Sequence, residues 1–272
     1  MNITLLVNRD LPSCLALNYI LPFLSSHRVF VFFSSRVGRE NKVISASMKQ
    51  LQFFEQELFN DVIFPLLDSD KSRSRKSSLQ SFSGLSMYCV TAPKELNDIN
   101  GRGIEALAST EPDLVVSIRY GVILQQEAIN IPRFGVLNLH SGDLPKYRGV
   151  MASFRALLAG DSELKATLHY IDDNGIDSGT IIRKSTLTVD KKKSYLWHVL
   201  SIYELGSRLV LDIVKQIDLG KKIKPGVSSE ELGVSQYYSF PLSEDIEKFE
   251  KLGFSLVQPE DVFPFVKKFM DE

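Results

Sequence analysis

The order in which short apolar runs alternate with helix-like segments constrains the fold of this chain more than any other feature. A β-branched run at 3–7, ITLLV, is followed by apolar residues at helical spacing from about 12 to 25 and then by VFVFF at 29–33. A strand, a helix and a second strand in this order are typical of the start of a parallel α/β sheet. The sequence therefore predicts an α/β fold built on a mostly parallel sheet.

Later segments continue this alternation. We expect helices in four more segments, at 45–64, 103–110, 151–159 and about 194–219. We expect strands in five more segments, at 86–90, 113–121, 135–140, 165–171 and 180–189. The last two strands flank the polar turn DDNGIDSG, which is typical of two strands joined by a functional loop.

Two segments depart from this pattern. Residues 68–84 are Ser-rich and charged and are expected to form an exposed loop. Its basic residues are interpreted as a solvated cluster, with contact to a substrate phosphate as the alternative. This cluster consists of Lys71, Arg73, Arg75 and Lys76. Prolines and short apolar pieces near the end predict a small C-terminal appendage, 221–272, beside a larger domain at 1–220.

The charge balance of the chain argues against a nucleic-acid partner. Its 272 residues include 32 Lys and Arg against 33 Asp and Glu, a formal net charge of −1, so no global positive field attracts a polyanion. Cys14 and Cys89 stand in apolar stretches and are expected to be core thiols. The apolar run at 14–24 is too short to span a membrane and lacks the features of a signal peptide. We expect a cytoplasmic protein with no membrane partner.

Polar side chains emerge together at the end of one predicted strand. In GVLNLH, at 135–140, Asn138 and His140 share a face, because successive side chains of a strand point to opposite faces. The carboxyl end of an inner strand is where open α/β sheets place ligands. The polar loop that follows later carries Asp172, Asp173 and Asp177, and it could fold back over this end.

These residue types suit an acyl transfer. An amide can donate to an oxyanion, an imidazole can accept a proton, and a carboxylate can orient the imidazole. The residues taken singly leave a second interpretation open: a hydrogen-bonded structural histidine and aspartates that form a turn. We expect no direct role for His27, His169 or His198, which lack a motif.

Two motifs carry a resemblance to a known family. NLHSGDLPKYRG, at 138–149, and DDNGIDSGTII, at 172–182, together resemble the formyltransferases, a family that includes methionyl-tRNA formyltransferase, glycinamide ribonucleotide transformylase and the sugar N-formyltransferases. Asp177 follows His140 by 37 residues, a spacing that agrees with the family. EPDLVVSIRYGVIL, at 111–124, resembles the family's strand and loop that hold the pterin ring of folate. The resemblance implies a Rossmann-like formyltransferase fold with flanking helices.

The resemblance also implies a mechanism and a donor. Asn138, His140 and Asp177 would form the catalytic trio of a formyltransferase that uses 10-formyltetrahydrofolate as co-substrate and no metal. Asn138 and protonated His140 would donate to the oxyanion, Asp177 would orient His140, and either His140 or a water would serve as base. The expected folate contacts are Tyr120, Gly121, Val122 and Leu124, with Asp172, Asp173 and Gly175 in the loop that closes on the ring. Arg148 is expected to have a structural role, pairing with a carboxylate or a backbone carbonyl.

The acceptor is expected to be a small-molecule amine, foremost an amino sugar attached to a nucleotide. NRDLPSC, at 8–14, lacks the glycine- and serine-rich phosphate loop of glycinamide ribonucleotide transformylase, and the 95 residues after Asp177 do not suggest a basic tRNA-binding domain. The residues Ser141, Gly142 and Asp143 are closer to the sugar-modifying relatives. A hydroxyornithine-type amine, hydrolysis of 10-formyltetrahydrofolate and a non-catalytic folate-binding protein are the alternatives. A homodimer is expected by analogy only.

Overall fold

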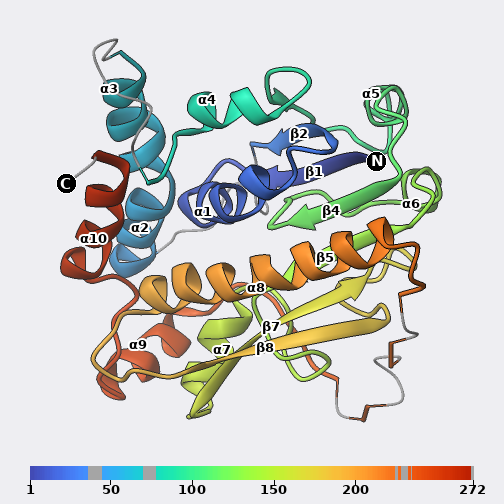
Figure 1. The fold of residues 1–272 in the computed structure, drawn as a ribbon. Helices are drawn as coiled ribbons and strands as arrows, with labels where there is room; N and C mark the ends of the chain where they lie inside the picture. The colour runs from blue at the N-terminus through green and yellow to red at the C-terminus, as the bar shows by residue number, and fades with distance from the viewer. Residues whose placement is uncertain (36–44, 70–77, 224–225, 228–231, 234, 271–272) are drawn as a thin grey trace.

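A central sheet with helices on both faces forms the body of the molecule (Figure 1). The computed structural model describes residues 1–35, 45–69, 78–223, 226–227, 232–233 and 235–270. Within them, the sheet has the strand order β3-β2-β1-β4-β5-β7-β8. The strands from β3 to β5 are parallel, and β7 pairs antiparallel with both β5 and β8. The α/β fold with a mostly parallel sheet is confirmed.

The strands of this sheet are β1 (Asn2–Asn8), β2 (Arg28–Ser34), β3 (Lys94–Glu95), β4 (Leu114–Ile118), β5 (Val136–His140), β7 (Glu163–Tyr170) and β8 (Ile181–Thr188). A second sheet has two strands, β6 (Arg148–Gly149) and β9 (Tyr237–Tyr238). Its strands are far apart in the sequence, so it ties the C-terminal part of the chain to the middle.

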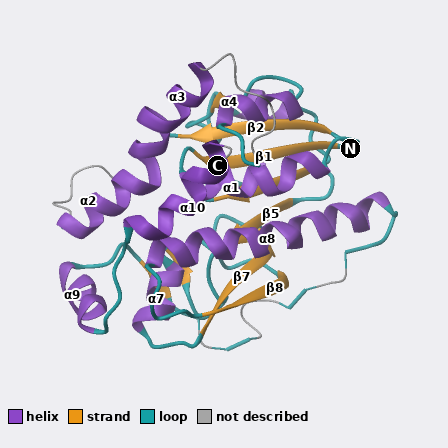
Figure 2. Cartoon of the chain, turned by 60° about the vertical axis from the view of Figure 1, so that its left-hand side comes forward, coloured by secondary structure: helices purple, strands orange, loops and turns teal. Residues whose placement is uncertain are grey.

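The α-helices are α1 (Leu11–Ile20), α2 (Ala46–Gln52), α3 (Phe64–Ser69), α4 (Phe82–Leu85), α5 (Ile104–Ala108), α6 (Gln126–Ile129), α7 (Ala152–Leu158), α8 (Tyr195–Asp218), α9 (Ser243–Lys251) and α10 (Pro259–Met270). A π-helix, η2 (Phe53–Ile63), joins α2 to α3, and η1 (Leu21–Phe23) and η3 (Ser86–Tyr88) are 3-10 turns. The long helix α8 packs beside α1 and across β7 and β8 (Figure 2). It is the expected covering helix.

Side chains close the starts of the two helices that cover the sheet. The carboxylate of Asp10 accepts from the Ser13 amide at 2.9 Å and caps α1, while the Ser194 hydroxyl accepts from the Trp197 amide at 3.3 Å and caps α8. Such caps satisfy amides that have no partner inside the helix. The two caps therefore fix the first residue of α1, directly after β1, and the first residue of α8.

Strand alternation divides the apolar side chains between two faces. Leu137 and Leu139 of β5 belong to the larger core with α1 and α8, whereas Val136 belongs to a smaller core on the other face, with Leu107 and Leu124. Asn138 therefore lies on the face of the smaller core, and His140 follows it there. The prediction that Asn138 and His140 share a face is confirmed.

The expected strand at 86–90 is wrong. Residues Ser86–Tyr88 form a 3-10 turn that continues from α4, because the Ser81 hydroxyl accepts from the Gly84 amide and starts a helix there. Met87 and Val90 are exposed, at 58% and 45%, so this apolar run does not belong to a buried strand. The strand that pairs with β2 is β3, a few residues later.

The expected loop at 68–84 is shorter than predicted, since α3 reaches Ser69 and α4 begins at Phe82. The basic cluster Lys71, Arg73, Arg75 and Lys76 lies outside the described residues. The described tail packs on the larger core, where the ring of Phe269 meets Phe59 at 5.7 Å and Phe249 meets Phe154 at 4.7 Å. The domain boundary at residue 220 stays a prediction. No helix in the described parts of the chain is long and apolar enough to cross a lipid bilayer.

Candidate active site

The last residues of β5 place two polar side chains at the carboxyl edge of the parallel strands. β5 pairs with β7 so that Asn138 stands opposite His169 and His140 opposite Thr167. His140 is 8% exposed, and Asn138 is half-buried. Both therefore lie in a sheltered position where hydrogen bonds to charged groups are strong.

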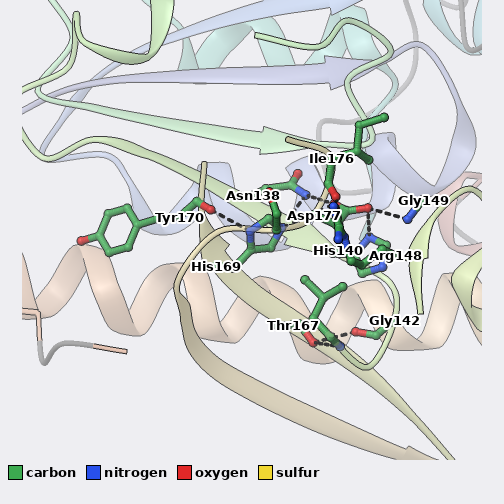
Figure 3. Close-up of polar contacts among 12 residues, drawn as sticks. Asn138, His140, Gly142, Arg148, Gly149, Thr167, His169, Tyr170, Ile176 and Asp177 are labelled. Carbon is green, nitrogen blue, oxygen red and sulfur yellow. Dashed lines mark hydrogen bonds and ion pairs between the residues drawn. The ribbon is translucent and has the colours of Figure 1, made fainter. Parts of the chain in front are cut away.

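The loop between β7 and β8 brings Asp177 to these two residues (Figure 3). Its Oδ2 lies 3.4 Å from Nδ1 of His140 and 2.8 Å from the amide of Gly149, and its Oδ1 lies 3.2 Å from Nδ2 of Asn138. Asp177 has a φ of +51°, a left-handed conformation that Asp tolerates better than most residues. The structure thus brings together the three side chains of the predicted trio.

Both ring nitrogens of His140 face acceptors. Nε2 lies 2.8 Å from the carbonyl oxygen of Tyr147, which can only accept, so Nε2 carries a hydrogen. Nδ1 faces the Asp177 carboxylate, and a lone pair there would meet negative charge. A hydrogen on each nitrogen would satisfy both contacts, and a hydrogen on Nδ1 is placed to be shared with an oxyanion.

Asn138 has a partner that the sequence analysis did not assign. Nδ1 of His169 lies 2.7 Å from the Tyr170 carbonyl and donates to it, so in the neutral ring Nε2 accepts from the Asn138 amide at 3.0 Å; Nε2 also lies 3.5 Å from Oδ1 of Asp177. The second amide hydrogen of Asn138 points to Asp177. Both hydrogens are engaged, so donation to a reacting group requires Asn138 to give up one of them, and the 3.2 Å contact to Asp177 is the longer.

The charge of Asp177 is strongly stabilised. Burial by itself raises the pKa of this carboxyl, but His140, His169 at 3.5 Å and the hydrogen bond from the Gly149 amide outweigh it, and the pKa lies well below its usual range. Asp177 is therefore ionised in the folded chain at neutral pH. The site therefore contains a buried negative charge held between His140 and Asn138.

Side chains of β7 and β8 hold the loop after β5 in place. Asp143 pairs with Lys165 at 2.9 Å and Lys184 at 2.6 Å, and Lys184 also donates to the carbonyl of Leu144 at 2.6 Å. The Thr167 hydroxyl donates to the carbonyl of Gly142 at 2.6 Å. Burial raises the pKa of Asp143, but Lys184 and Lys165 lower it by more, so the net pKa is lowered and the carboxylate stays ionised. These contacts hold the loop in which Tyr147 meets His140.

The segment expected to hold the pterin ring follows β4. The Gly121 amide donates to the Ser34 hydroxyl at 2.9 Å, and the Tyr120 hydroxyl donates to the carbonyl of Leu96. Tyr120 and Val122 are half-buried against the smaller core, whereas Leu124 is 3% exposed and belongs to that core. The side chain of Leu124 is thus committed to packing, and a ligand contact there stays a prediction.

The other expected folate contacts lie in the loop that carries Asp177. Asp172 accepts from the Thr180 amide at 2.7 Å and Asp173 from the Gly175 amide at 2.7 Å. Both carboxylates therefore stabilise the loop's own turns, as Asp does in many turns. All three of these residues are exposed, so the loop presents them at the surface beside Asp177.

A buried charge cluster lies at the same edge of the sheet, at the ends of β1 and β4. Arg119 has a φ of +58° and binds Asp10 at 2.7 Å and Glu55 of the π-helix at 2.9 Å. Asp10 is 0% exposed, and burial raises the pKa of Glu55 although Arg119 opposes this. The guanidinium lies 5.9 Å from the ring centroid of Tyr203 of α8. No pattern in the sequence predicted this cluster.

The remaining predicted residues have structural contacts. Arg148 donates to the carbonyl of Ile176 at 2.8 Å, one of the two kinds of partner expected for it. His27 pairs with Asp218 at 3.1 Å, and His198 contacts the carbonyl of Ser194 at 2.8 Å. His169, in contrast, was expected to have no direct role but contacts Asn138. No local pattern predicts this contact, because it depends on the register between β5 and β7.

Comparison with known proteins identifies the family. The model of the formyl transferase family matches residues 42–198, more than half of the chain. The chain belongs to the formyl transferase family. A methionyl-tRNA formyltransferase of Kosmotoga olearia is 34% identical over 137 residues, which cover 50% of the chain and 43% of that relative. The chain thus spans less than half the length of this curated formyltransferase.

Solved formyltransferases share the fold. An N-formyltransferase of Helicobacter canadensis, in complex with folinic acid and dTDP-3-aminofucose, has a TM-score of 0.56 at 17% identity, covering 94% of the chain and 81% of that structure. Glycinamide ribonucleotide transformylase 1 of Symbiobacterium toebii has a TM-score of 0.55 at 16% identity, covering 83% and 93%. The Rossmann-like formyltransferase fold is confirmed. In the described residues no group of three or more His, Cys, Asp or Glu side chains is arranged to hold a metal ion.

Proposed function

We propose that this chain transfers a formyl group from 10-formyltetrahydrofolate to the amine of a small molecule, foremost an amino sugar attached to a nucleotide. The observation that carries the proposal is the ionised Asp177 between Nδ1 of His140 and Nδ2 of Asn138. Family membership supports formyl transfer. The identity of the acceptor rests on the charge balance and on the residues after His140.

In the proposed reaction the acceptor nitrogen forms a bond to the formyl carbon, and the carbonyl oxygen becomes an oxyanion. His140 donates to it from Nδ1, because its 3.4 Å contact with Asp177 is longer than the roughly 2.7–2.9 Å of a strong charged hydrogen bond and leaves that hydrogen to be shared. Asn138 donates the hydrogen that it releases from Asp177. The donor nitrogen then leaves with a proton, which yields a formamide and tetrahydrofolate.

Asp177 has two duties in this scheme. Its negative charge stabilises His140 when that ring carries the extra proton, and its contact with Asn138 orients the amide. Donors that are already in place when charge develops are the most effective source of catalysis in acyl transfer. The proton of the attacking amine is taken by His140 in its neutral form or by a water.

The residues around β4 suit a folate donor. Tyr120 and Val122 offer half-buried apolar surface, and Ile123 is 54% exposed in the irregular segment after β4. The loop with Asp172, Asp173 and Gly175 lies at the surface beside Asp177 and would close on the same ring. We propose that the pterin binds between these two segments. We also propose a cytoplasmic protein, because Cys14 and Cys89 are free thiols.

Two features favour a small acceptor. The carboxylate of Asp10 caps α1, so the chain's own anion occupies the helix start after β1, where the phosphate loop of glycinamide ribonucleotide transformylase would be expected. The net charge of −1 offers no attraction to tRNA. A solved relative of this fold binds dTDP-3-aminofucose, which supports an amino sugar as the first acceptor to try.

A second candidate is the formylation of methionyl-tRNA. It is favoured by relatives of 27–34% sequence identity that are named methionyl-tRNA formyltransferases. The matched region of the chain, however, covers 43% of the Kosmotoga olearia relative, so the remaining part of that protein has no counterpart in the match. The two candidates differ in the acceptor and share the trio.

The test is a panel of acceptors with the purified chain and 10-formyltetrahydrofolate. The panel contains nucleotide-linked amino sugars with amines at different ring positions, a hydroxylated ornithine, methionyl-tRNA and no acceptor. We expect tetrahydrofolate and a formamide with an amino sugar, and loss of transfer on the order of 100-fold or more in His140→Ala. Matched control His27→Ala, at a histidine that pairs with Asp218, should retain transfer.

The other outcomes decide between the alternatives. Transfer to methionyl-tRNA alone would replace the acceptor, and transfer to the hydroxylated ornithine alone would do the same. Formate release without an acceptor would make the chain a hydrolase. Binding of the donor without any turnover would make it a folate-binding protein. Undiminished transfer by His140→Ala would refute the mechanism.

A further inference from the structure

A short strand from the C-terminal part of the chain lies directly against the loop that follows β5. β9 pairs in parallel with β6, with Arg148 opposite Tyr237 and Gly149 opposite Tyr238. The amide of Arg148 donates to the carbonyl of Gln236 at 2.9 Å, and the amide of Val150 donates to the carbonyl of Tyr238 at 2.9 Å. Residues 235–239 are called the C-terminal strap below.

We infer that the C-terminal strap positions the trio by fixing the two groups that hold His140. The first of these groups is the Asp177 carboxylate, which accepts from the Gly149 amide at 2.8 Å. Gly149 has a φ of +90°, and a Cβ on it would lie 2.3 Å from the carbonyl oxygen of Tyr238 and 2.8 Å from the ring of Tyr237. The strap therefore presses on Gly149 and sets the direction of its amide.

The second group is the carbonyl of Tyr147, which accepts from Nε2 of His140 at 2.8 Å. The ring of Tyr147 packs 6.0 Å from the ring of Tyr238, and the amide of Gln236 donates to the carbonyl of Pro145 at 3.4 Å. Both protein partners of the His140 ring are therefore anchored on the same five-residue segment. A shift of the strap would move them together.

The strap is itself anchored at both ends. At its start, the hydroxyl of Ser235 accepts from Arg148, whose Nε donates to the carbonyl just before Asp177. At its end, Arg155 of α7 donates to the carbonyl of Ser239 at 3.2 Å, lies 5.1 Å from the ring of Tyr238 and pairs with Asp245 of α9 at 2.8 Å. Arg155 is nearly buried, with 10% of its side chain exposed, so this anchor is well shielded from water.

The strap lies outside residues 42–198, the part of the chain that matches the family. No hydrogen bond or ion pair joins residues 235–239, all of which the structure describes, to the side chains of the trio, so we treat them as positioning residues. This inference rests on the proposed function only for its catalytic consequence. Its structural part concerns the surroundings of Gly149 and His140, which can be measured without turnover.

The test compares Tyr238→Gly with Tyr238→Phe in the full chain. Tyr238→Gly removes the ring that packs on Tyr147 and Arg155 and loosens the strand, whereas Tyr238→Phe keeps both. We expect kcat to fall on the order of 10- to 100-fold in Tyr238→Gly with little change in KM for the donor, and to recover in Tyr238→Phe. Val262→Ala, in the buried part of α10, controls for general destabilisation: it should lower Tm and keep kcat.

Nuclear magnetic resonance at one fixed pH supplies the readout that does not depend on turnover. The amide proton of Gly149, which donates to a carboxylate, should lie downfield in the wild type and move upfield in Tyr238→Gly, together with a change in the His140 ring nitrogens. Val262→Ala should leave both unchanged. Wild-type signals in Tyr238→Gly, or a loss of kcat no greater than the loss of folded protein, would overturn the inference. A chain without transfer activity would refute the proposed function and leave the spectroscopic test intact.

Discussion

Asp177 meets His140 across 37 residues of sequence, with 3.4 Å between the carboxylate oxygen and Nδ1. The two come from different elements, a loop after β7 and the end of β5. Because the carboxylate is buried and ionised, its main effect on His140 is electrostatic, and replacement by Asn removes that charge together with one of the two acceptor oxygens while keeping the shape of the side chain.

Asp177→Asn should therefore lower kcat on the order of 100-fold while KM for the donor changes little. The amide keeps the size of the side chain but no longer stabilises a cationic His140. Steady-state kinetics of formyl transfer provide the measurement. Asp212→Asn removes the same charge from an exposed pair with Arg183 and serves as the control. Equal rates in wild type and Asp177→Asn would contradict the role of the charge.

The same substitution has a pH signature in stability. The pKa of Asp177 is lower in the folded chain than the value of about 3.9 in an unfolded one, so the ionised group contributes stability above about pH 4. That contribution is lost as the pH falls through the lower, folded-state pKa. The gap in urea midpoint between wild type and Asp177→Asn should be present at neutral pH and close in strongly acidic solution. A difference in urea midpoint that stays constant from neutral to strongly acidic pH would contradict the lowered pKa of Asp177.

Gly142→Ala should impair the site through simple overlap. An added Cβ would lie 2.5 Å from Cβ of Ala152 and 2.6 Å from Nε2 of His140, so the ring must move away from the carbonyl of Tyr147. We expect kcat to fall on the order of 10-fold or more. Gly160→Ala is the matched control, because its Cβ meets nothing within 4 Å although its φ of +80° costs about 1–2 kcal/mol of stability. If both variants lose activity in step with Tm, the steric explanation fails.

Arg119→Met should destabilise the fold strongly. It leaves Asp10 and Glu55 as buried carboxylates without their cation, and breaking such a pair costs about 3–5 kcal/mol. Arg183→Met, in the exposed pair with Asp212, should cost no more than about 1 kcal/mol. Urea denaturation measures both free energies of unfolding. Comparable small losses in the two variants would mean that the cluster at the ends of β1 and β4 contributes little.

The fold was predictable where local pattern decides the structure. The runs at 3–7, 29–33 and 113–121 are apolar and β-branched, and they became neighbouring parallel strands. The error at 86–90 arose because a short apolar run does not distinguish a strand from a turn, and the cap at Ser81 decided for a helical turn. The pairing of Tyr237 with Arg148 was not predictable, since it joins segments that share no local signal.

The candidate site was predictable in its side chains and not in its backbone. Alternation placed Asn138 and His140 on one face, and the motif supplied Asp177. His169 was missed because its partner depends on the register between β5 and β7, which sequence alone does not give. The amide of Gly149 and the carbonyl of Tyr147 were missed because every residue carries such groups, and only the fold shows which of them meet a charge.

The pairing of β6 with β9 has a consequence for exchanging parts among formyl transferases. A chimera that keeps residues 42–198 and receives the tail of another member would inherit Asn138, His140 and Asp177 unchanged. It would lose Tyr238, which lies in the replaced tail, so the loop with Gly149 would no longer have the strand that pairs with it. The segment from β5 to Ser239 should therefore be exchanged as a whole, with the junctions placed before β5 or after Ser239.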